Sequence, residues 1–411
     1  MRKNPPLSTT AARIRPPVFA DLQARIDALA GKGLELVPLQ IGDTWMAPPA
    51  SARRALGALD PEDPTLHRYG PTAGVGALRA AVARRVRPHG LEIDPEAEVL
   101  VGNGGTHALF CAARAVLDAG DEVLMASPYW PLAPGIFTSC GALPVDVPLT
   151  QRLFADPSLD AGAVLAAGLT PRTKAIYLIS PNNPDGKVLS REQLSSIARV
   201  ACEHDLWVFS DEVYADIVFA GEHVSIASLP GMRDRTIVLH SMSKSHALAG
   251  ARVGFVVAPP PVVISGRRVS THSAFNVSVA MQRAALAALE EGDFPKNACA
   301  QYREARDVTA KALAAAGGKV RAHLAEGATY LFLDFAPAFA AMDPERAGPK
   351  PLLALLERAV DRGVLLAPGD AFGATYETCA RLCYTAVPAP KVALGVERLL
   401  DALDAMEKGR P

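Results

Sequence analysis

The sequence predicts an α/β fold, with a mostly parallel large-domain sheet covered by helices on both faces and a smaller α+β domain. Three observations predict it. The chain has 411 residues, enough for two or three domains at about 150 residues each. Hydrophobic residues make up 49% and charged residues 21%, a mixture that can bury a large core. From about residue 95, short apolar runs alternate with longer helical stretches, a pattern typical of parallel strands buried on both faces.

The predicted sheet lies in the middle of the chain. Its strands are expected at residues 98–101, 122–126, 143–147, 174–179, 206–209, 237–240 and 253–257. Helices are expected between them at residues 106–117, 132–140 and 191–204, and the proline run 259–261 is expected to be a loop. Ligands of such sheets bind at the carboxyl ends of the strands, so the polar residues that follow each strand are the candidates for function.

The pattern changes after about residue 292. A long helix at 295–316, strands at 329–335 and 381–385, and helices at 352–362 and from 391 are expected there. We therefore predict a large domain at residues 51–292 and a small C-terminal domain at 293–411. The first 50 residues have no room for a core of their own and are expected to join the small domain.

Charge and composition exclude several classes of protein. With 42 Lys and Arg against 43 Asp and Glu, the net charge is −1, and no basic cluster favours a nucleic acid or an anionic membrane as partner. The uncharged stretch 123–145 is long enough to span a bilayer, but its prolines and glycines favour buried soluble structure. The six cysteines show no metal-type pairing, and the first residues show no secretory signal. A reduced, cytoplasmic enzyme without a metal site is expected.

Two polar segments follow predicted strands. The segment 180–186 (SPNNPDG) predicts a rigid turn, in which Asn183 can donate a side-chain hydrogen bond. In the segment 209–214 (FSDEVY), Asp211 leaves an apolar strand, where a carboxylate is costly unless it is paired. Tyr214 follows closely enough to share one turn with Asp211. Taken alone, each segment is more often an ordinary turn or helix cap than part of a site.

A third segment, 240–254 (HSMSKSHALAGARVG), is more specific. Lys244 follows an apolar strand between Ser241 and Ser243, and Arg252 follows later in the segment. An amine in a semi-buried turn lined by hydroxyls suits a Schiff-base nucleophile whose pKa is lowered by its surroundings. A lone lysine at a strand end would equally suit the protein surface, but the whole pattern of Ser, Lys, Gly and Arg does not.

These segments, in this order, resemble the class I/II aminotransferases of the fold-type I pyridoxal-phosphate (PLP) enzymes, which are aspartate aminotransferase-like. The resemblance runs from about Gly42 to Arg381. It implies that Lys244 forms a Schiff base with pyridoxal 5'-phosphate and that Asp211 pairs with the pyridine nitrogen. It also implies that Tyr214 and Asn183 bind the phenolic oxygen of the cofactor.

The same resemblance implies the remaining cofactor contacts. The glycine-rich loop 101–107 lies between a strand and a helix, where backbone N–H groups can reach an anion. The implied phosphate-binding set is Gly104, Gly105, Thr106, Ser241, Ser243 and Arg252. Trp130 is implied to stack on the cofactor ring, with Tyr129 as the alternative. Tyr69 is implied to reach the partner's phosphate across the interface of a homodimer whose active sites lie at that interface.

Substrate contacts are implied for Arg381, Gly42, Asn183 and Trp45. Arg381 is expected to open its strand and to bind the substrate α-carboxylate with both guanidinium nitrogens. Trp45 could cover an apolar or aromatic side chain, whereas Asp370 could face a cationic one or cap a helix. Thr106 stands where aspartate-handling relatives place a lysine, which weakens an aspartate assignment without excluding it. The amino donor and the oxo acid therefore stay open.

The expected activity is the transfer of an amino group between an L-amino acid and a 2-oxo acid, through the Lys244 Schiff base and pyridoxamine phosphate. Two alternatives use the same scaffold: a PLP-dependent carbon–sulfur β-lyase and a PLP-dependent amino-acid oxidase. Arg381 favours transamination because it would orient the Cα–H bond, and not the Cα–carboxylate bond, for cleavage. Related carbon–sulfur lyases share that arginine, so the preference is modest.

Overall fold

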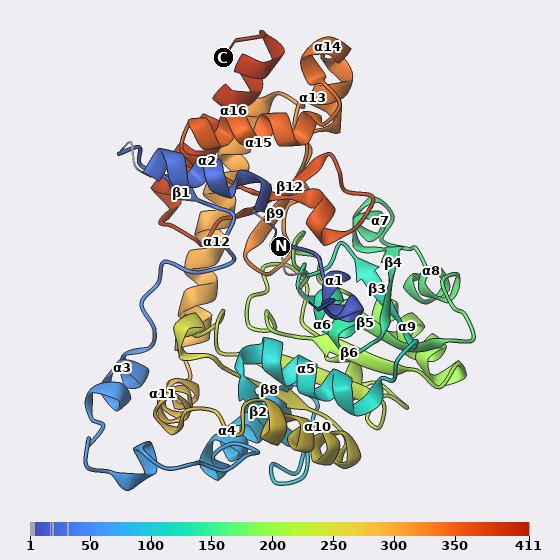
Figure 1. Cartoon of the computed structure of the whole chain (residues 1–411), viewed down its shortest axis with the longest axis vertical. Helices are drawn as coiled ribbons and strands as arrows, with labels where there is room; N and C mark the ends of the chain where they lie inside the picture. Colours follow the sequence, from blue (N-terminus) through green and yellow to red (C-terminus); the bar gives the residue numbers. More distant parts are fainter. Residues whose placement is uncertain (1–4, 17, 19, 31–32, 411) are drawn as a thin grey trace.

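A seven-stranded sheet forms the centre of the protein in a computed structural model that describes residues 5–16, 18, 20–30 and 33–410 (Figure 1). From one edge to the other, its strands are β2 (Val99–Asn103), β8 (Val253–Val257), β7 (Thr236–Ser241), β6 (Trp207–Asp211), β5 (Thr173–Ile179), β3 (Glu122–Ser127) and β4 (Leu143–Pro148). Only β8 runs antiparallel to its neighbours among these strands. The predicted mostly parallel sheet is confirmed, and all its predicted strands are present.

Helices cover both faces of this sheet, as predicted. Successive strand residues point to opposite faces, so Tyr177 and Phe209 join one core cluster while Ile176 and Val208 join another. The first cluster includes residues of α5 (Gly104–Val116) and α6 (Ala133–Ser139), and the second includes residues of α8 (Ala161–Ala166) and α9 (Arg191–Glu203). The other helices of this part are α3 (Ala50–Gly57), α4 (Gly76–Val86), α7 (Thr150–Ala155), α10 (Pro260–Ser273) and α11 (Val279–Glu290).

The stretch 123–145 forms β3, α6 and the first residues of β4, so it is part of the sheet layer. None of the helices in the described ranges is long and apolar enough to cross a membrane.

A second group of elements lies beside the large sheet. Its strands are β9 (Tyr330–Asp334), β11 (Ala367–Pro368) and β12 (Cys379–Cys383) in one small sheet, with β1 (Val37–Pro38) and β10 (Val364–Leu365) in another. Its helices are α2 (Ala20–Ala30), α12 (Phe294–Leu313), α13 (Ala336–Ala341), α14 (Pro344–Ala347), α15 (Pro351–Asp361) and α16 (Ala389–Glu407). The pairing of β1 with β10 brings an N-terminal segment against the C-terminal part of the chain (Figure 1). The short helix α1 (Thr9–Ala12) packs near α6 instead.

Two expectations from the sequence are wrong in detail. Strand β12 begins at Cys379, so Arg381 lies in its middle, paired with Phe332 of β9, and does not open the strand. The charge is tolerated there because the guanidinium has polar and aromatic partners, described below. The prolines expected in a loop begin α10, since a proline in the first helical turn sacrifices no hydrogen bond. Residues 1–4, 17, 19, 31–32 and 411, which include parts of the predicted N-terminal segment, lie outside the described residues.

Candidate active site

Several of the predicted site residues gather at the carboxyl ends of the strands of the large sheet. Asp211 is the last residue of β6, and Ser241 is the last residue of β7. Asn183 lies in the turn after β5, and α5 begins at Gly104 directly after β2. Because β5, β6 and β7 are parallel neighbours, their carboxyl ends lie side by side, which is where open α/β sheets bind ligands.

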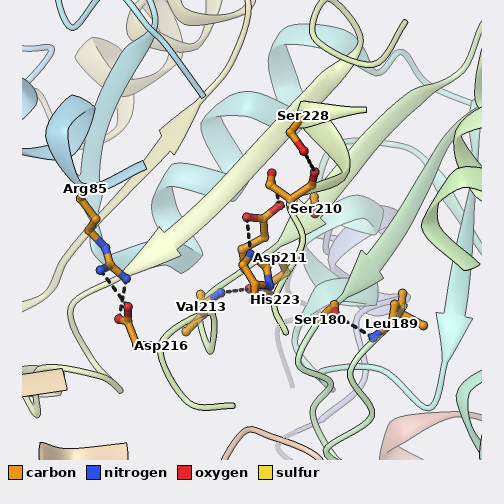
Figure 2. Close-up of polar contacts among 11 residues, drawn as sticks. Arg85, Ser180, Leu189, Ser210, Asp211, Val213, Asp216, His223 and Ser228 are labelled. Carbon is orange, nitrogen blue, oxygen red and sulfur yellow. Dashed lines mark hydrogen bonds and ion pairs between the residues drawn. The ribbon is translucent and has the colours of Figure 1, made fainter. Parts of the chain in front are cut away.

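Asp211 is a buried carboxylate held by two neutral donors. Its Oδ2 accepts a hydrogen bond of 3.0 Å from the Tyr177 hydroxyl. Its Oδ1 accepts one of 3.2 Å from the Val213 N–H (Figure 2). Burial raises the pKa of Asp211 to about 7; the bonds from Tyr177 and Val213 oppose this rise, Glu212 adds to it, and Lys244 opposes it. In the described part of the chain, no lysine, arginine or histidine donates a hydrogen bond to this carboxylate.

Lys244 lies half-buried in the turn after β7, and its Nζ donates a short hydrogen bond to the Gly42 carbonyl. Gly42 is pressed against the Tyr330 hydroxyl, so that a side chain at this position would collide with it. The Tyr330 hydroxyl in turn lies 2.8 Å from that of Tyr214. Burial raises the pKa of Tyr214 well above its ordinary value, so its hydroxyl stays protonated. Close packing of Gly42 on Tyr330 therefore brings the Lys244 amine and the Tyr214–Tyr330 hydroxyl pair into one region of the site.

Arg381 is buried, and the structure brings it together with Asn183. One guanidinium nitrogen donates to Asn183 Oδ1 at 3.0 Å, and another donates to the Gln40 carbonyl at 2.7 Å. The guanidinium carbon lies 4.4 Å from the ring centre of Tyr330 and 5.0 Å from that of Phe372. These contacts fix a planar cation in a buried position, where it can bind a carboxylate.

The glycine-rich loop forms a cup at the N-terminus of α5. Gly104 has a φ of +75°, and its N–H donates to the Arg252 carbonyl at 2.9 Å. The Arg252 guanidinium packs directly against Gly104, where any side chain would displace it. Ser241 donates to the Ser243 hydroxyl at 2.9 Å, and a methyl group at Gly105 would lie 3.6 Å from Ser241 Cβ. The N-terminus of a 13-residue helix, with an arginine and two hydroxyls beside it, can hold an anion.

Three comparisons with known proteins agree with this arrangement. The family model for aminotransferase class I and II matches residues 35–399. The chain belongs to this family. A probable aspartate/prephenate aminotransferase of Thermus aquaticus is 34% identical over 405 residues, which cover 97% of both chains. The arginine–pyruvate transaminase of Pseudomonas aeruginosa is 35% identical over 360 residues, which cover 86% of both chains.

Among solved structures, the aspartate aminotransferase of Thermus thermophilus with maleate has a TM-score of 0.85 and 30% identity, and the match covers 98% of this chain and all of that one. The chain is thus an aminotransferase of the fold-type I PLP-dependent family, and transamination is its activity.

Other predicted residues of this aminotransferase lie around the cluster. Thr106 is in the first turn of α5, and Trp130 is half-buried against the main core beside the buried Tyr129. Trp45 is 41% exposed, and Tyr69 is 84% exposed, with its ring against Phe275. Neither has its side chain enclosed by the residues of the site.

The remaining candidates have ordinary surroundings. Asp370 is exposed, and its carbonyl accepts a hydrogen bond of 2.9 Å from Arg15. His246 is buried beside the Ser245 hydroxyl, and His272 lies on the exposed side of α10. Over the described ranges, no group of three or more His, Cys, Asp or Glu is placed to hold a metal ion.

Sequence reasoning missed Tyr177, Tyr330 and Gln40. Tyr177 and Tyr330 lie in fully buried strand stretches, where a tyrosine cannot be told from an ordinary apolar core residue by the sequence pattern. One signal was available: a buried tyrosine hydroxyl normally finds a hydrogen-bond partner, and Tyr177 stands two residues before the end of its strand. Gln40 contributes only its carbonyl, which no sequence pattern marks.

Beside the candidate site, the aminotransferase has a second set of buried charges. Glu212 accepts hydrogen bonds from His223 at 2.9 Å, Ser225 at 2.7 Å and Ser210 at 2.9 Å. Arg85 and Asp216 form an ion pair at 2.6 Å, and Ser180 accepts the Leu189 N–H at 3.0 Å (Figure 2). Each of these carboxylates has charged or multiple polar partners, whereas within the described ranges Asp211 accepts hydrogen bonds only from the neutral Tyr177 and Val213.

Proposed function

We propose that the cluster around Lys244 binds pyridoxal 5'-phosphate and uses it to transfer an amino group from an L-amino acid to a 2-oxo acid. The observation that carries this proposal is Asp211. A fully buried carboxylate with neutral donors only is costly unless a cationic group joins it, and the pyridine nitrogen of PLP is such a group when protonated. The cup at Gly104 supports the proposal, because the Arg252 guanidinium, the hydroxyls of Ser241 and Ser243 and the N-terminus of α5 suit the phosphate at the other end of the same molecule.

The proposed roles follow from these positions. Catalysis is assigned to Lys244, Asp211 and Tyr214. Cofactor binding is assigned to Gly104, Gly105, Thr106, Trp130, Asn183, Asp211, Tyr214, Ser241, Ser243, Lys244, Arg252 and, from the partner subunit, Tyr69. Substrate binding is assigned to Gly42, Asn183, Arg381 and Trp45.

When bound, PLP supplies a ring that accepts electrons from the substrate's α-carbon. Arg381 binds the substrate α-carboxylate, and its stacking between Tyr330 and Phe372 fixes the orientation of the α-carbon. Lys244 Nζ takes the proton from the α-carbon as general base and later returns a proton as general acid. The Gly42 carbonyl accepts a hydrogen bond from this Nζ and so restricts where the amine lies.

Three further expectations belong to this proposal. Residues 51–292 act as the cofactor-binding domain, and residues 1–50 and 293–411 form the second domain, which the pairing of β1 with β10 supports, while α1 packs near α6. The protein acts as a homodimer, which the 84% exposure of Tyr69 supports because an aromatic surface side chain is typical of an interface. The protein works in the cytoplasm. Sedimentation of the purified protein tests the dimer.

The proposal is tested by the visible absorbance of the PLP-loaded protein while single amino acids are added, with and without oxygen. L-aspartate, L-arginine and L-phenylalanine represent acidic, basic and aromatic donors. We expect at least one of them to convert the cofactor band to that of pyridoxamine phosphate and to yield its oxo acid. L-Cystathionine, which carries sulfur on its β-carbon, tests the β-lyase alternative: release of ammonia and pyruvate from it would show a β-lyase, and consumption of oxygen would show an oxidase.

Lys244→Ala tests the role of the lysine in catalysis. We expect turnover to fall by at least about 100-fold, because the general base is removed. The exposed Lys174→Ala serves as control and should retain wild-type turnover. Transamination by Lys244→Ala at the wild-type rate would overturn the assignment of the catalytic lysine.

A further inference from the structure

We propose that Tyr177 is a positioning residue that holds Asp211 as an oriented anion for the cationic ring nitrogen of the cofactor. Tyr177 lies outside the proposed site set, two residues before the end of β5, and this role rests on the proposed binding of PLP. The Tyr177 hydroxyl donates to Asp211 Oδ2 at 3.0 Å, and both side chains are buried.

The sheet register places the two residues for this contact. Ile179 of β5 pairs with Asp211 of β6, and Tyr177 pairs with Phe209. Tyr177 and Asp211 are therefore diagonal neighbours on the same face of adjacent strands, a separation that a long aromatic side chain can span. The position of the hydroxyl follows from the backbone and needs no flexible loop.

Aromatic packing fixes the tyrosine ring. The ring of Phe137 from α6 lies 5.5 Å from that of Tyr177 and 5.2 Å from that of Phe209. The edge-on contact of Phe137 with Tyr177 closes the face of the sheet over the tyrosine. A hydroxyl held in this way loses little further freedom when it donates to the carboxylate, so its direction is set in advance.

A neutral donor suits this position better than a cationic one would. Burial raises the pKa of Tyr177 well above its ordinary value, and Asp211 raises it further, so the hydroxyl keeps its proton and can only donate it to the carboxylate. A histidine or arginine in the same place would neutralise Asp211 and compete with the ring nitrogen. The tyrosine stabilises the anion and leaves its full charge for the ligand.

The other groups that face Asp211 do not replace this contact. The Val213 N–H binds the other carboxylate oxygen at 3.2 Å, and Lys244 opposes protonation of Asp211 through its charge alone. Glu212 acts in the opposite direction and favours protonation. The hydrogen bond from Tyr177 has the largest effect among the influences that keep Asp211 ionised.

The test measures the ring nitrogen and does not depend on turnover. Protein is loaded with PLP that carries ¹⁵N in the ring, and the ¹⁵N chemical shift is followed from pH 6 to pH 9 in the wild type and in Tyr177→Phe. We expect the carboxylate of Asp211 to become more basic in Tyr177→Phe and to draw the proton away from the ring nitrogen, so that the ¹⁵N signal lies closer to that of the neutral ring throughout this pH range. We also expect at least about tenfold weaker binding of PLP.

Two comparisons make the result specific. Tyr384→Phe removes another buried tyrosine hydroxyl, which donates to the Ala328 carbonyl at 2.8 Å, and should leave the nitrogen signal unchanged. In an Asp211→Asn background, Tyr177→Phe should cause no further change, since the anion is gone. Tyr177→Met, which also lacks the hydroxyl, takes the place of Tyr177→Phe if that variant does not fold. A ring-nitrogen titration equal to that of the wild type in Tyr177→Phe or Tyr177→Met would overturn the inference.

Discussion

Asp211 and Glu212 are neighbours in the sequence and both are buried, yet their surroundings differ sharply. Burial raises the pKa of Asp211 to about 7, and its two neutral donors do not compensate. Burial also acts to raise the pKa of Glu212, but the charge and hydrogen bond of His223, with further help from His240 and Ser225, lower it below the ordinary value. The polar partners of Glu212 are complete, and those of Asp211 are not.

The difference separates a structural polar cluster from a binding site. A buried carboxylate with all its partners stabilises one conformation and offers nothing to a ligand. A buried carboxylate with too few partners lowers the stability of the empty protein, and a cationic ligand recovers that loss when it binds.

Arg85→Ala has the largest expected effect, because it breaks a completed pair. Arg85 and Asp216 lie 2.6 Å apart with side chains only 14% and 15% exposed, and Arg85 helps to lower the pKa of Asp216 despite burial. Removal of the arginine leaves an uncompensated buried carboxylate, which we expect to cost about 3–5 kcal/mol in the free energy of unfolding. Urea denaturation at pH 7 measures this change.

A surface pair provides the control for Arg85→Ala. The side chains of Arg87 and Glu92 are 64% and 73% exposed, so Arg87→Ala should cost less than about 1 kcal/mol. Equal losses in the two variants would contradict the distinction between a completed buried pair and a surface pair.

Asp211→Asn should change how the stability of the cofactor-free protein depends on pH. The folded pKa is about 7 against 3.8 for the unfolded chain, so the folded state holds the proton more tightly. The wild type should therefore be more stable at low pH, and this contribution is lost as the pH rises from about 4 to 7. At 1.36 kcal/mol per unit, the loss amounts to at most about 4 kcal/mol. Urea denaturation between pH 5 and pH 8 measures it.

In Asp211→Asn this part of the pH dependence should disappear, while binding of PLP becomes weaker because the anion is absent. The exposed Asp234→Asn should keep the wild-type dependence. An unchanged slope between pH 5 and pH 7 in Asp211→Asn would show that Asp211 is already paired in the empty protein, and the comparison with Glu212 would fail.

Most of the sheet and the main site residues could be predicted from the sequence, because their signals are local. Fully buried parallel strands are continuous apolar runs, and Asp211, Asn183 and Lys244 interrupt such runs at the strand ends. Resemblance to a family then added roles that local patterns do not carry.

Residues whose role depends on distant partners could not be predicted. The buried position of Arg381 within β12 depends on Tyr330 and Phe372, which stack on its guanidinium. When these distant partners are unknown, a charged residue beside an apolar run is predicted to mark the boundary of a strand. Tyr177 has its polar contact with a residue of the next strand, and only the register of β5 and β6 reveals it.

Glu212→Gln has the smallest expected effect, and its pH dependence should be the reverse of that of Asp211→Asn. The variant keeps the shape of the side chain but weakens hydrogen bonds from Ser210, Ser225 and His223 to a charged acceptor, at a cost of about 1.5–3 kcal/mol. Because the folded pKa of Glu212 lies below its ordinary 4.5, the wild-type contribution is present above pH 4.5 and is lost as the pH falls through the folded pKa. The difference in the free energy of unfolding between the variant and the wild type should thus be full at pH 7 and shrink in acid, as urea denaturation at several pH values would show.

A loss of stability in Glu212→Gln that grew in acid would mean that Glu212, like Asp211, lacks sufficient partners. Neighbouring carboxylates on one strand end would then share one electrostatic environment, and the separation between structural cluster and binding site would have to be drawn elsewhere.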